Sequence, residues 1–133
     1  MFLVRLIYCS TPSGVGDADI EDILDRSRAN NALDGITGVL LYDGTHFLQV
    51  LEGGRSAVSK RFIVICNDKR HRDVELMELS PIRARRFPHW TMAYVGGTGL
   101  DEVIVSTYTA GGFDPRRMIN MDGVMDMVWR LSQ

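Results

Sequence analysis

Alternating hydrophobic and polar positions at the start of the chain predict a strand over residues 2–9 (FLVRLIYC). Successive side chains of a strand point to opposite faces, so Tyr8 lies on the apolar face of this strand. The stretch STPSGVG then interrupts the pattern. A helix is predicted to follow as far as about Ala29, with Asp17 or Asp19 as its N-cap and further acidic residues in its first turns.

A hairpin is predicted next. Residues 35–43 (GITGVLLYD) are nearly all apolar, which is typical of a buried strand, and Asp43-Gly44 is a strong turn signal. Residues 47–53 (FLQVLEG) form the second strand of the hairpin. Apolar residues at helical spacing then predict a second helix over about 56–67.

The remaining segments predict two more strands and a helical end. The strands cover 73–80 and 90–95. A short helix is predicted at 100–109, although its β-branched residues favour a strand. The last helix follows Asp114-Pro115, a typical helix start. Its apolar stripe consists of Met118, Met121, Met125 and Val128.

The element order βαββαββ predicts an α+β fold, a ferredoxin-like sheet with one appended strand. Right-handed crossovers place the first two helices on one face of this sheet. We assign 1–96 to the core and 97–133 to a C-terminal helical cap that covers the other face. Methionine packs adaptably, and we expect the last helix to contribute to a homodimer. The alternative is a monomer in which this helix only closes the core.

Composition narrows the possible classes of function. A chain of 133 residues with a net charge of −2 fits one globular domain and has no general electrostatic footprint for nucleic acid. The basic run RARRF at 83–87 is interpreted as a solvated surface. Cys9 and Cys66 lack the spacing of a redox motif and are interpreted as reduced core residues of a cytoplasmic protein. The scattered histidines indicate no zinc site, and no apolar run is long enough to span a membrane.

Gln49 is a polar residue inside the apolar strand 47–53. Burying a primary amide without partners costs about 2–7 kcal/mol, so Gln49 needs a hydrogen-bond partner. Polar residues also continue the apolar stripes of both predicted helices. The first stripe is Ile20, Ile23, Leu24, Ser27 and Asn31; the second leads from Ile65 to Asp68 and is followed by Arg70 and His71.

These residues predict a slot between two helices over the sheet. Its walls would include Ile23 and Ile65, and its rim would carry Gln49, Asn31 and Asp68. Such a slot suits a planar heteroaromatic whose edge alternates acceptors and N–H groups, as a flavin edge does. Ordinary alternatives remain open, because Asn31 can satisfy the last carbonyls of its own helix and Asp68 can belong to a charged helix end.

Five segments of the chain resemble the BLUF domains, which are blue-light sensors using FAD. They are RLIYCS (5–10), SRANNALDGITGVLLY (27–42), FLQVLEG (47–53), NDKRHRDVE (67–75) and RRFPHWTM (85–92). The segments occur in the order of the family and need no forced gaps across residues 1–95. FLQVLEG together with NNALDGITG makes the resemblance specific.

The resemblance implies an FAD held non-covalently between the two helices, with FMN or riboflavin as alternative ligands. Tyr8 is similar to the photoactive tyrosine of the family, and Gln49 to the glutamine between that tyrosine and flavin N5. Asn31 is similar to the side chain that bonds the flavin C4 carbonyl and N3. The positions near the ribityl chain and the polar edge of the flavin are matched by Asp68, Arg70 and His71.

The resemblance also implies how a signal arises. After blue light, Tyr8 gives up an electron and then a proton through Gln49, and recombination leaves the glutamine rotated or tautomerised. Trp90 and Met92 match the W-x-M pair whose arrangement near Gln49 relays the signal. Val64 departs from the family, because some relatives have an arginine that points toward the flavin at this position. No substrate is turned over, so the resemblance implies a receptor and not an enzyme.

Two other classes of function compete with a photoreceptor. A ferredoxin-like module can sense a metabolite without photochemistry. A small enzyme such as an acyl-phosphate hydrolase would need an arginine beside an anion-binding loop, and STPSGVG has none. Because the chain ends soon after residue 96, we expect no fused catalytic domain. The signal is therefore expected to leave through an unidentified signalling partner or a change in self-association.

Overall fold

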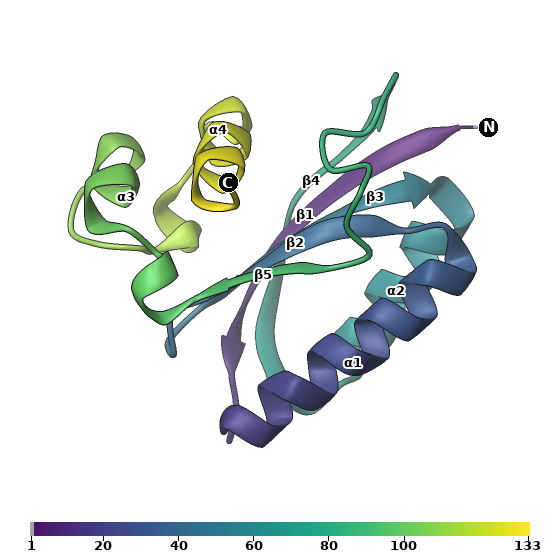
Figure 1. Cartoon of the computed structure of the whole chain (residues 1–133), viewed down its shortest axis with the longest axis horizontal. Helices are drawn as coiled ribbons and strands as arrows, with labels where there is room; N and C mark the ends of the chain where they lie inside the picture. The colour runs from purple at the N-terminus through teal and green to yellow at the C-terminus, as the bar shows by residue number, and fades with distance from the viewer. Residues whose placement is uncertain (1) are drawn as a thin grey trace.

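The computed structural model describes residues 2–133 and contains a five-stranded sheet with helices on both faces (Figure 1). The strands are β1 (Leu3–Pro12), β2 (Thr37–Tyr42), β3 (Phe47–Gly54), β4 (His71–Ile82) and β5 (Ala93–Gly96). Their spatial order is β4-β1-β3-β2-β5. All neighbours are antiparallel except β2 and β5, which are parallel. The structure therefore confirms the ferredoxin-like fold with one appended strand.

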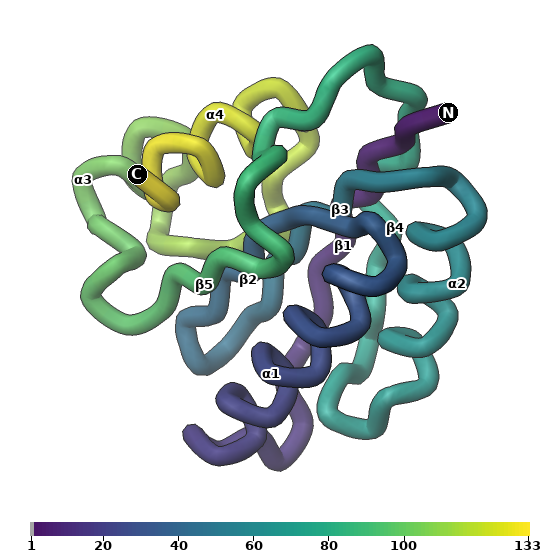
Figure 2. The backbone as a smooth tube through the Cα atoms, turned by 45° about the vertical axis from the view of Figure 1, so that its right-hand side comes forward, coloured from purple at the N-terminus to yellow at the C-terminus, as the bar shows by residue number. Residues whose placement is uncertain are grey.

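The helices form a layer on each side of the sheet (Figure 2). One layer consists of α1 (Asp17–Asp34) and α2 (Arg55–Cys66). The other contains α3 (Glu102–Tyr108) and α4 (Met121–Leu131). A short 3₁₀ turn at Gly97–Gly99 leads from β5 toward α3, and another at Pro115–Arg117 lies between α3 and α4. We refer to residues 97–133 as the cap. The predicted placement of the helices on the two faces is confirmed.

Alternation along each strand divides the interior into two apolar clusters, one on each face. The cluster under α1 and α2 contains Leu6, Leu40 and Leu51. The cluster under the cap contains their strand neighbours, such as Ile7, together with Val124 and other residues of α4. The strands β1 to β4 therefore each contribute to two separate cores, whereas β5 contributes Ala93 and Val95 to the cluster under the cap alone.

Gly38 is a position at which β2 leaves no room for a side chain against β3. A Cβ atom at this position would overlap the main-chain carbonyl oxygen of Val50. The main-chain N–H of Gly38 donates to the carbonyl of Trp90 at 3.0 Å. A side chain here would therefore separate two strands and displace the segment that leads into β5.

Several segment boundaries differ from the prediction. The helix α1 continues past Ala29 to Asp34 and ends at Gly35, which has a φ of 67°. The strand β5 begins at Ala93 instead of residue 90. The reason is that the carbonyls of Thr91 and Met92 accept hydrogen bonds from side chains of α1 and do not join the ladder.

Two further predictions were wrong, one about the burial of Cys66 and one about the start of the last helix, although Met118 packs against the cluster under the cap as expected. Cys66 is exposed at the end of α2, whereas Cys9 is buried as expected. Met118 precedes the last helix, because Asp114 starts only a 3₁₀ turn and Asn120 caps α4 by accepting from the main-chain N–H of Gly123. The buried positions of α4 are Val124, Met125, Met127, Val128 and Leu131.

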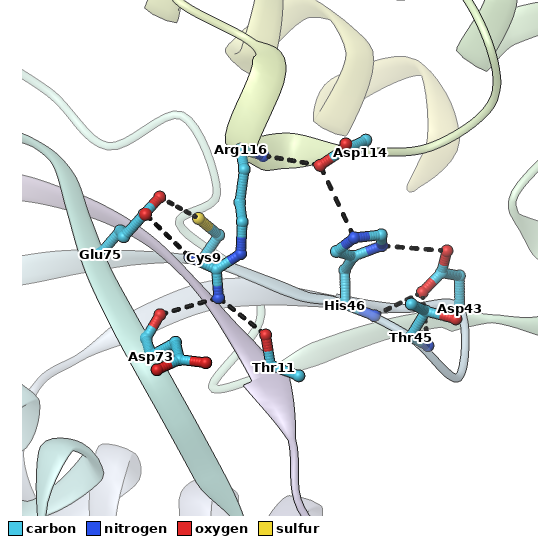
Figure 3. Close-up of polar contacts among 9 residues, drawn as sticks. All are labelled: Cys9, Thr11, Asp43, Thr45, His46, Asp73, Glu75, Asp114 and Arg116. Atoms are coloured by element: carbon cyan, nitrogen blue, oxygen red, sulfur yellow. Dashed lines mark hydrogen bonds and ion pairs between the residues drawn. The ribbon is translucent and has the colours of Figure 1, made fainter.

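Arg116 connects the cap to the sheet (Figure 3). Its guanidinium donates to Thr11 Oγ1 and to the carbonyl of Asp73, each at 2.8 Å, and pairs with Glu75 at 3.0 Å. Asp73 has a φ of 50°, the one positive value among the non-glycine residues from 2 to 133. Nearby, His46 lies 3.6 Å from the carboxylate of Asp114. The 3₁₀ turn before α4 is thus fixed to the ends of β1 and β4.

Candidate functional site

The strand register brings Tyr8 and Gln49 together. They are direct partners in the antiparallel β1–β3 ladder, and Leu40 of β2 lies opposite Gln49 on its other side. All three side chains point to the face covered by α1 and α2. Their strand neighbours Leu48 and Val50 point to the cap instead. A one-residue change of register would therefore bury Gln49 under the cap, away from Tyr8.

Gln49 has two side-chain partners within the protein. The hydroxyl of Tyr8 donates to Gln49 Oε1, and Gln49 Nε2 contacts Met92 Sδ at 3.3 Å. All three residues are buried. Burial raises the pKa of Tyr8 far above its ordinary value, and the charges of Cys66 and Asp68 raise it further. Tyr8 therefore keeps its proton at neutral pH and can act as a proton donor.

Met92 and Trp90 lie on opposite faces of the sheet. Met92 is buried in the cluster under α1 and α2, where it contacts Gln49. Trp90 packs against the cluster under the cap, with its ring centroid 6.2 Å from that of Phe87. The sequence grouped both residues with Gln49, but the structure brings only Met92 to it.

Asn31 joins α1 to the segment that carries Met92. Its Nδ2 donates to the carbonyl of Thr91 at 2.7 Å. Its side chain therefore does not cap the carbonyls of its own helix, which was the ordinary alternative. Asn31 Oδ1 is buried and has no hydrogen-bond partner among residues 2–133. A buried carbonyl oxygen normally has a partner, so this atom indicates a missing donor.

An ionic cluster lies at the ends of the two helices. The guanidinium of Arg70 bonds both carboxylate oxygens of Asp68, the closer at 2.8 Å, and also bonds Asp22 of α1 at 2.9 Å. The hydrogen bonds from Arg70 lower the pKa of Asp68. Arg70 therefore ties α2 to α1 and leaves Asp68 ionised.

His71 closes the same end of the site from the sheet. Its Nδ1 lies 2.8 Å from Ser10 Oγ, and its ring is 4.6 Å from that of Phe47 and 6.1 Å from that of Tyr8. Burial lowers the pKa of His71 to about 4. The imidazole is therefore neutral at pH 7 and can both donate and accept one hydrogen bond.

A cavity of about 150 Å³ between α1 and α2 is lined by most of the predicted residues. They are Tyr8, Ile23, Ser27, Gln49, Ile65, Asp68, Arg70 and His71. We call this cavity the slot. Asn30, not Asn31, lies on its wall, together with Arg26 and Arg61, which the sequence reasoning did not select. Helical spacing could have found Arg26 and Asn30, because they follow Ile23 by three and seven positions on one helix face.

The slot suits a flavin in its chemistry. Its lining combines apolar side chains with the amides of Asn30 and Gln49, and Arg26, Arg61 and Arg70 provide positive charge for a phosphate-bearing tail. Arg61 Nε is a second buried atom without a hydrogen-bond partner in the described chain. The volume is below the range of about 300–1,000 Å³ that is common for ligand sites. The slot can become larger if the long side chains of these arginines turn outward.

The fold and site thus define a ferredoxin-like protein with a slot for a planar ligand between two helices. A family model described as "Sensors of blue-light using FAD" (BLUF) matches residues 3–93. The chain therefore belongs to the BLUF family of blue-light flavin sensors, which confirms the resemblance found in the sequence.

Curated relatives are larger light-regulated proteins. The photoactivated adenylate cyclase subunit beta of Euglena longa is 34% identical over 108 residues, which are 80% of this chain and 12% of the relative. The blue light- and temperature-regulated antirepressor BluF of Escherichia coli (strain K12) is 35% identical over 68 residues, covering 51% of this chain and 17% of the relative. The chain thus spans less than a fifth of the length of these two proteins.

Solved structures of similar length resemble the whole chain. BlrB, a BLUF protein in its dark state, has a TM-score of 0.81 and 35% identity, covering 98% of this chain and 96% of that one. The photo-activated state of BlsA has a TM-score of 0.87 and 31% identity, covering 97% and 94%. The similarity therefore includes the cap as well as the sheet.

Proposed function

We propose that this chain is a blue-light receptor in which Tyr8 and Gln49 form the switch and the domain itself turns over no substrate. The observation that supports it most is the buried series of contacts from Tyr8 through Gln49 to Met92, which faces the slot. Such a series connects a redox-active phenol to a side chain that can change its hydrogen bonds without breaking covalent bonds.

A bound flavin would supply absorption of blue light and, once excited, a strong electron acceptor. Tyr8 would lose an electron and the proton of its hydroxyl, which already points at Gln49 Oε1. Gln49 would relay that proton toward the electron acceptor, and return of the electron and the proton would restore Tyr8 and leave the Gln49 amide rotated or tautomerised. Its contact with Met92 Sδ would then change, because an amide oxygen cannot donate where Nε2 donated before.

We propose FAD as the ligand, with FMN or riboflavin as weaker substitutes. Three arginines line the slot, and the carboxylate partners Asp22 and Asp34 that pair with them are about half exposed. A phosphate group can therefore replace these carboxylates at little cost in desolvation. Gln49 would hold the edge of the ring, and Asn31 Oδ1, which lacks a partner among residues 2–133, would accept from it once the ligand has widened the slot. Ile23 and Ile65 would contact the faces of the ring.

The output is proposed to pass from Met92 into the 83–92 loop and then to a partner protein. The end of the loop is held at Thr91 by Asn31 and at Met92 by Arg28, so a change at Gln49 would act through Met92 on the part of the loop that leads into β5. No helix among residues 2–133 is long and apolar enough to cross a membrane. A cytoplasmic location and a homodimer formed through the cap remain predictions.

The proposal is tested by absorption spectroscopy on purified protein loaded with FAD. We expect a yellow protein whose flavin band shifts reversibly to the red under blue light. Tyr8→Phe and Gln49→Leu should each retain flavin and lose the normal shift. Tyr42→Phe is the matched control, because Tyr42 stacks on Phe47 and its hydroxyl takes no part in the switch. A colourless protein after loading would favour a metabolite-binding module instead.

A further inference from the structure

A second hollow lies on the cap side of the sheet, away from the slot. This groove, of about 340 Å³, lies between the 83–92 loop and the end of α4. Phe87, Trp90 and Trp129 form its floor, with the rings of Trp90 and Trp129 centred 6.2 Å and 6.1 Å from that of Phe87. Trp129 is 37% exposed, so an aromatic surface is open to a ligand.

The loop beside the groove carries arginine side chains that form no ion pair among residues 2–133. Arg86 lies over Trp129 at 4.6 Å from its ring centroid, and Arg83 is exposed on the same loop. Arg85 donates only to neutral oxygens, among them a main-chain carbonyl of Gly35 at 2.7 Å.

The acidic residue next to the loop is already neutralised. Glu52 is fully buried and pairs with Arg5 at 2.7 Å. Its carboxylate accepts the main-chain N–H groups of Arg86 and Phe87 at 3.0 Å and 2.8 Å. The sequence analysis interpreted the basic run at 83–87 as a solvated surface. In the structure this run is instead a fixed cationic edge beside an aromatic floor. The chain as a whole has a net charge of −2.

We propose that this groove binds an acidic segment of a partner protein, which places one apolar side chain on the aromatic floor. Arginine binds carboxylates through two parallel hydrogen bonds, and exposed aromatic rings supply the apolar contact on which interface energy concentrates. Nucleic acid fits less well. Arg86 covers the face of Trp129 on which a base would stack.

The groove is connected to the slot through the loop that forms its floor. Trp90 is two residues from Met92, and its carbonyl accepts the N–H of Gly38 at 3.0 Å. Glu52, which holds the loop at Phe87, is three residues from Gln49 on β3. Binding is therefore expected to differ between dark and illuminated protein. This light dependence, unlike the docking itself, rests on the proposed function.

The experiment measures binding of a defined peptide to the FAD-loaded protein. The probe is a decapeptide of glutamates around a central Phe-Leu pair, and its label absorbs far-red light so that reading the anisotropy does not excite the flavin. Comparison probes are the same peptide with lysines and a single-stranded oligothymidine of equal charge. We expect saturable binding of the acidic peptide, no binding of the lysine peptide, and weak binding of the oligonucleotide.

Charge variants locate the binding. The double variant Arg83→Gln/Arg86→Gln should weaken peptide binding by about tenfold or more, because it removes two charged donors at exposed positions. Arg72→Gln removes the same charge at the distant end of β4 and should change binding less than twofold. An equal loss of peptide affinity in Arg72→Gln would overturn the proposal. It would also be overturned if the oligonucleotide bound more tightly than the acidic peptide and the double variant lost that binding.

Illumination separates this proposal from the proposed function. A normal flavin shift with a change in peptide affinity of about threefold or more supports both the groove and its coupling. A normal flavin shift with unchanged peptide affinity overturns the coupling between the slot and the groove. The charge variants then decide whether the groove binds the peptide. Peptide binding that depends on the arginines in a protein lacking the shift supports the docking and contradicts the photoreceptor.

Discussion

On the face covered by the cap, β3 contributes Leu48 and Val50, both fully buried in a cluster of apolar side chains. On the face covered by α1 and α2, the same strand contributes Gln49 between Phe47 and Leu51. Adjacent residues of one strand thus serve different purposes. One face closes the fold, and the other holds polar groups that a closed apolar core would exclude.

The two faces also differ in how completely they satisfy their polar atoms. Both buried side-chain atoms that lack a partner among residues 2–133, Asn31 Oδ1 and Arg61 Nε, lie on the helix-covered face. An unsatisfied buried group costs about 1–3 kcal/mol. The helix-covered face therefore gives up stability where a ligand can restore it, whereas the cap-covered face does not.

The largest expected effect comes from making a cavity on the cap-covered face. Leu48→Ala should lower the free energy of unfolding by about 2–5 kcal/mol, because a fully buried side chain is truncated. Leu33→Ala, at a position that is 87% exposed, should change it by less than about 0.5 kcal/mol. Urea unfolding measures both. Loss of the flavin shift in folded Leu48→Ala, with stability unchanged, would contradict the division between the faces.

His71 should make the helix-covered face sensitive to acid. Its pKa is about 4 in the folded protein and about 6.5 when unfolded, so the unfolded chain binds more protons in between. The stabilisation by neutral His71 is complete above pH 6.5 and is lost as the pH falls toward 4, by about 3 kcal/mol in all.

The measurement for this pH effect is urea unfolding of the flavin-free protein at several pH values between 7 and 4. His71→Gln keeps a side chain able to bond Ser10 and should flatten the dependence in this window. His89→Gln, at an exposed position, is the control and should leave the dependence as it is. An equally steep loss of stability in His71→Gln would show that carboxylates cause it.

The switch residues should matter less for stability than for light. Gln49→Leu leaves the hydroxyl of buried Tyr8 without its acceptor, so we expect a loss of about 1–2 kcal/mol. Tyr8→Phe/Gln49→Leu removes both partners and should recover part of this loss. Unfolding of the flavin-free variants tests the pair. A double variant less stable than the sum of the single changes would refute the direct Tyr8–Gln49 bond.

The smallest effect is expected at the connection between the cap and the sheet. Arg116→Ala removes bonds to Thr11, Asp73 and Glu75 at a partly exposed site, so we expect about 1 kcal/mol. Hydrogen exchange should become faster in α4 and stay unchanged in α1. Arg117→Ala, on the same 3₁₀ turn, is the control. Equal acceleration in both helices would mean that the cap is not a separate unit.

Much of this division could be predicted from the sequence, because it follows from period-two alternation. Alternation predicts Tyr8 and Gln49 on one face of the sheet and the apolar stripe of the last helix on the other. The resemblance to the BLUF family then indicated a flavin as the ligand. Helix and strand ends were less accurate, since Asn31 and Arg28 bond carbonyls of the 83–92 loop from about 60 residues away in the chain.

The remaining features depend on tertiary contacts that no local pattern records. Trp90 and Met92 are separated by one residue, so alternation would place them on the same face of a strand. They lie on opposite faces because residues 90–92 are not part of the strand. Arg61 and Asn30 could have been selected by helical spacing, but their role depends on how closely α1 and α2 approach each other.

Gly38 shows how structural and functional constraint could be told apart in a population of mutants. Because a Cβ atom there would overlap the Val50 carbonyl, every substitution should be rejected by a selection for folded protein alone. Several substitutions at Gln49 should survive the selection for folded protein. The same substitutions should fail a selection that requires a light response. Position 38 would thus be invariant in any descendant that keeps this sheet, even one that no longer senses light.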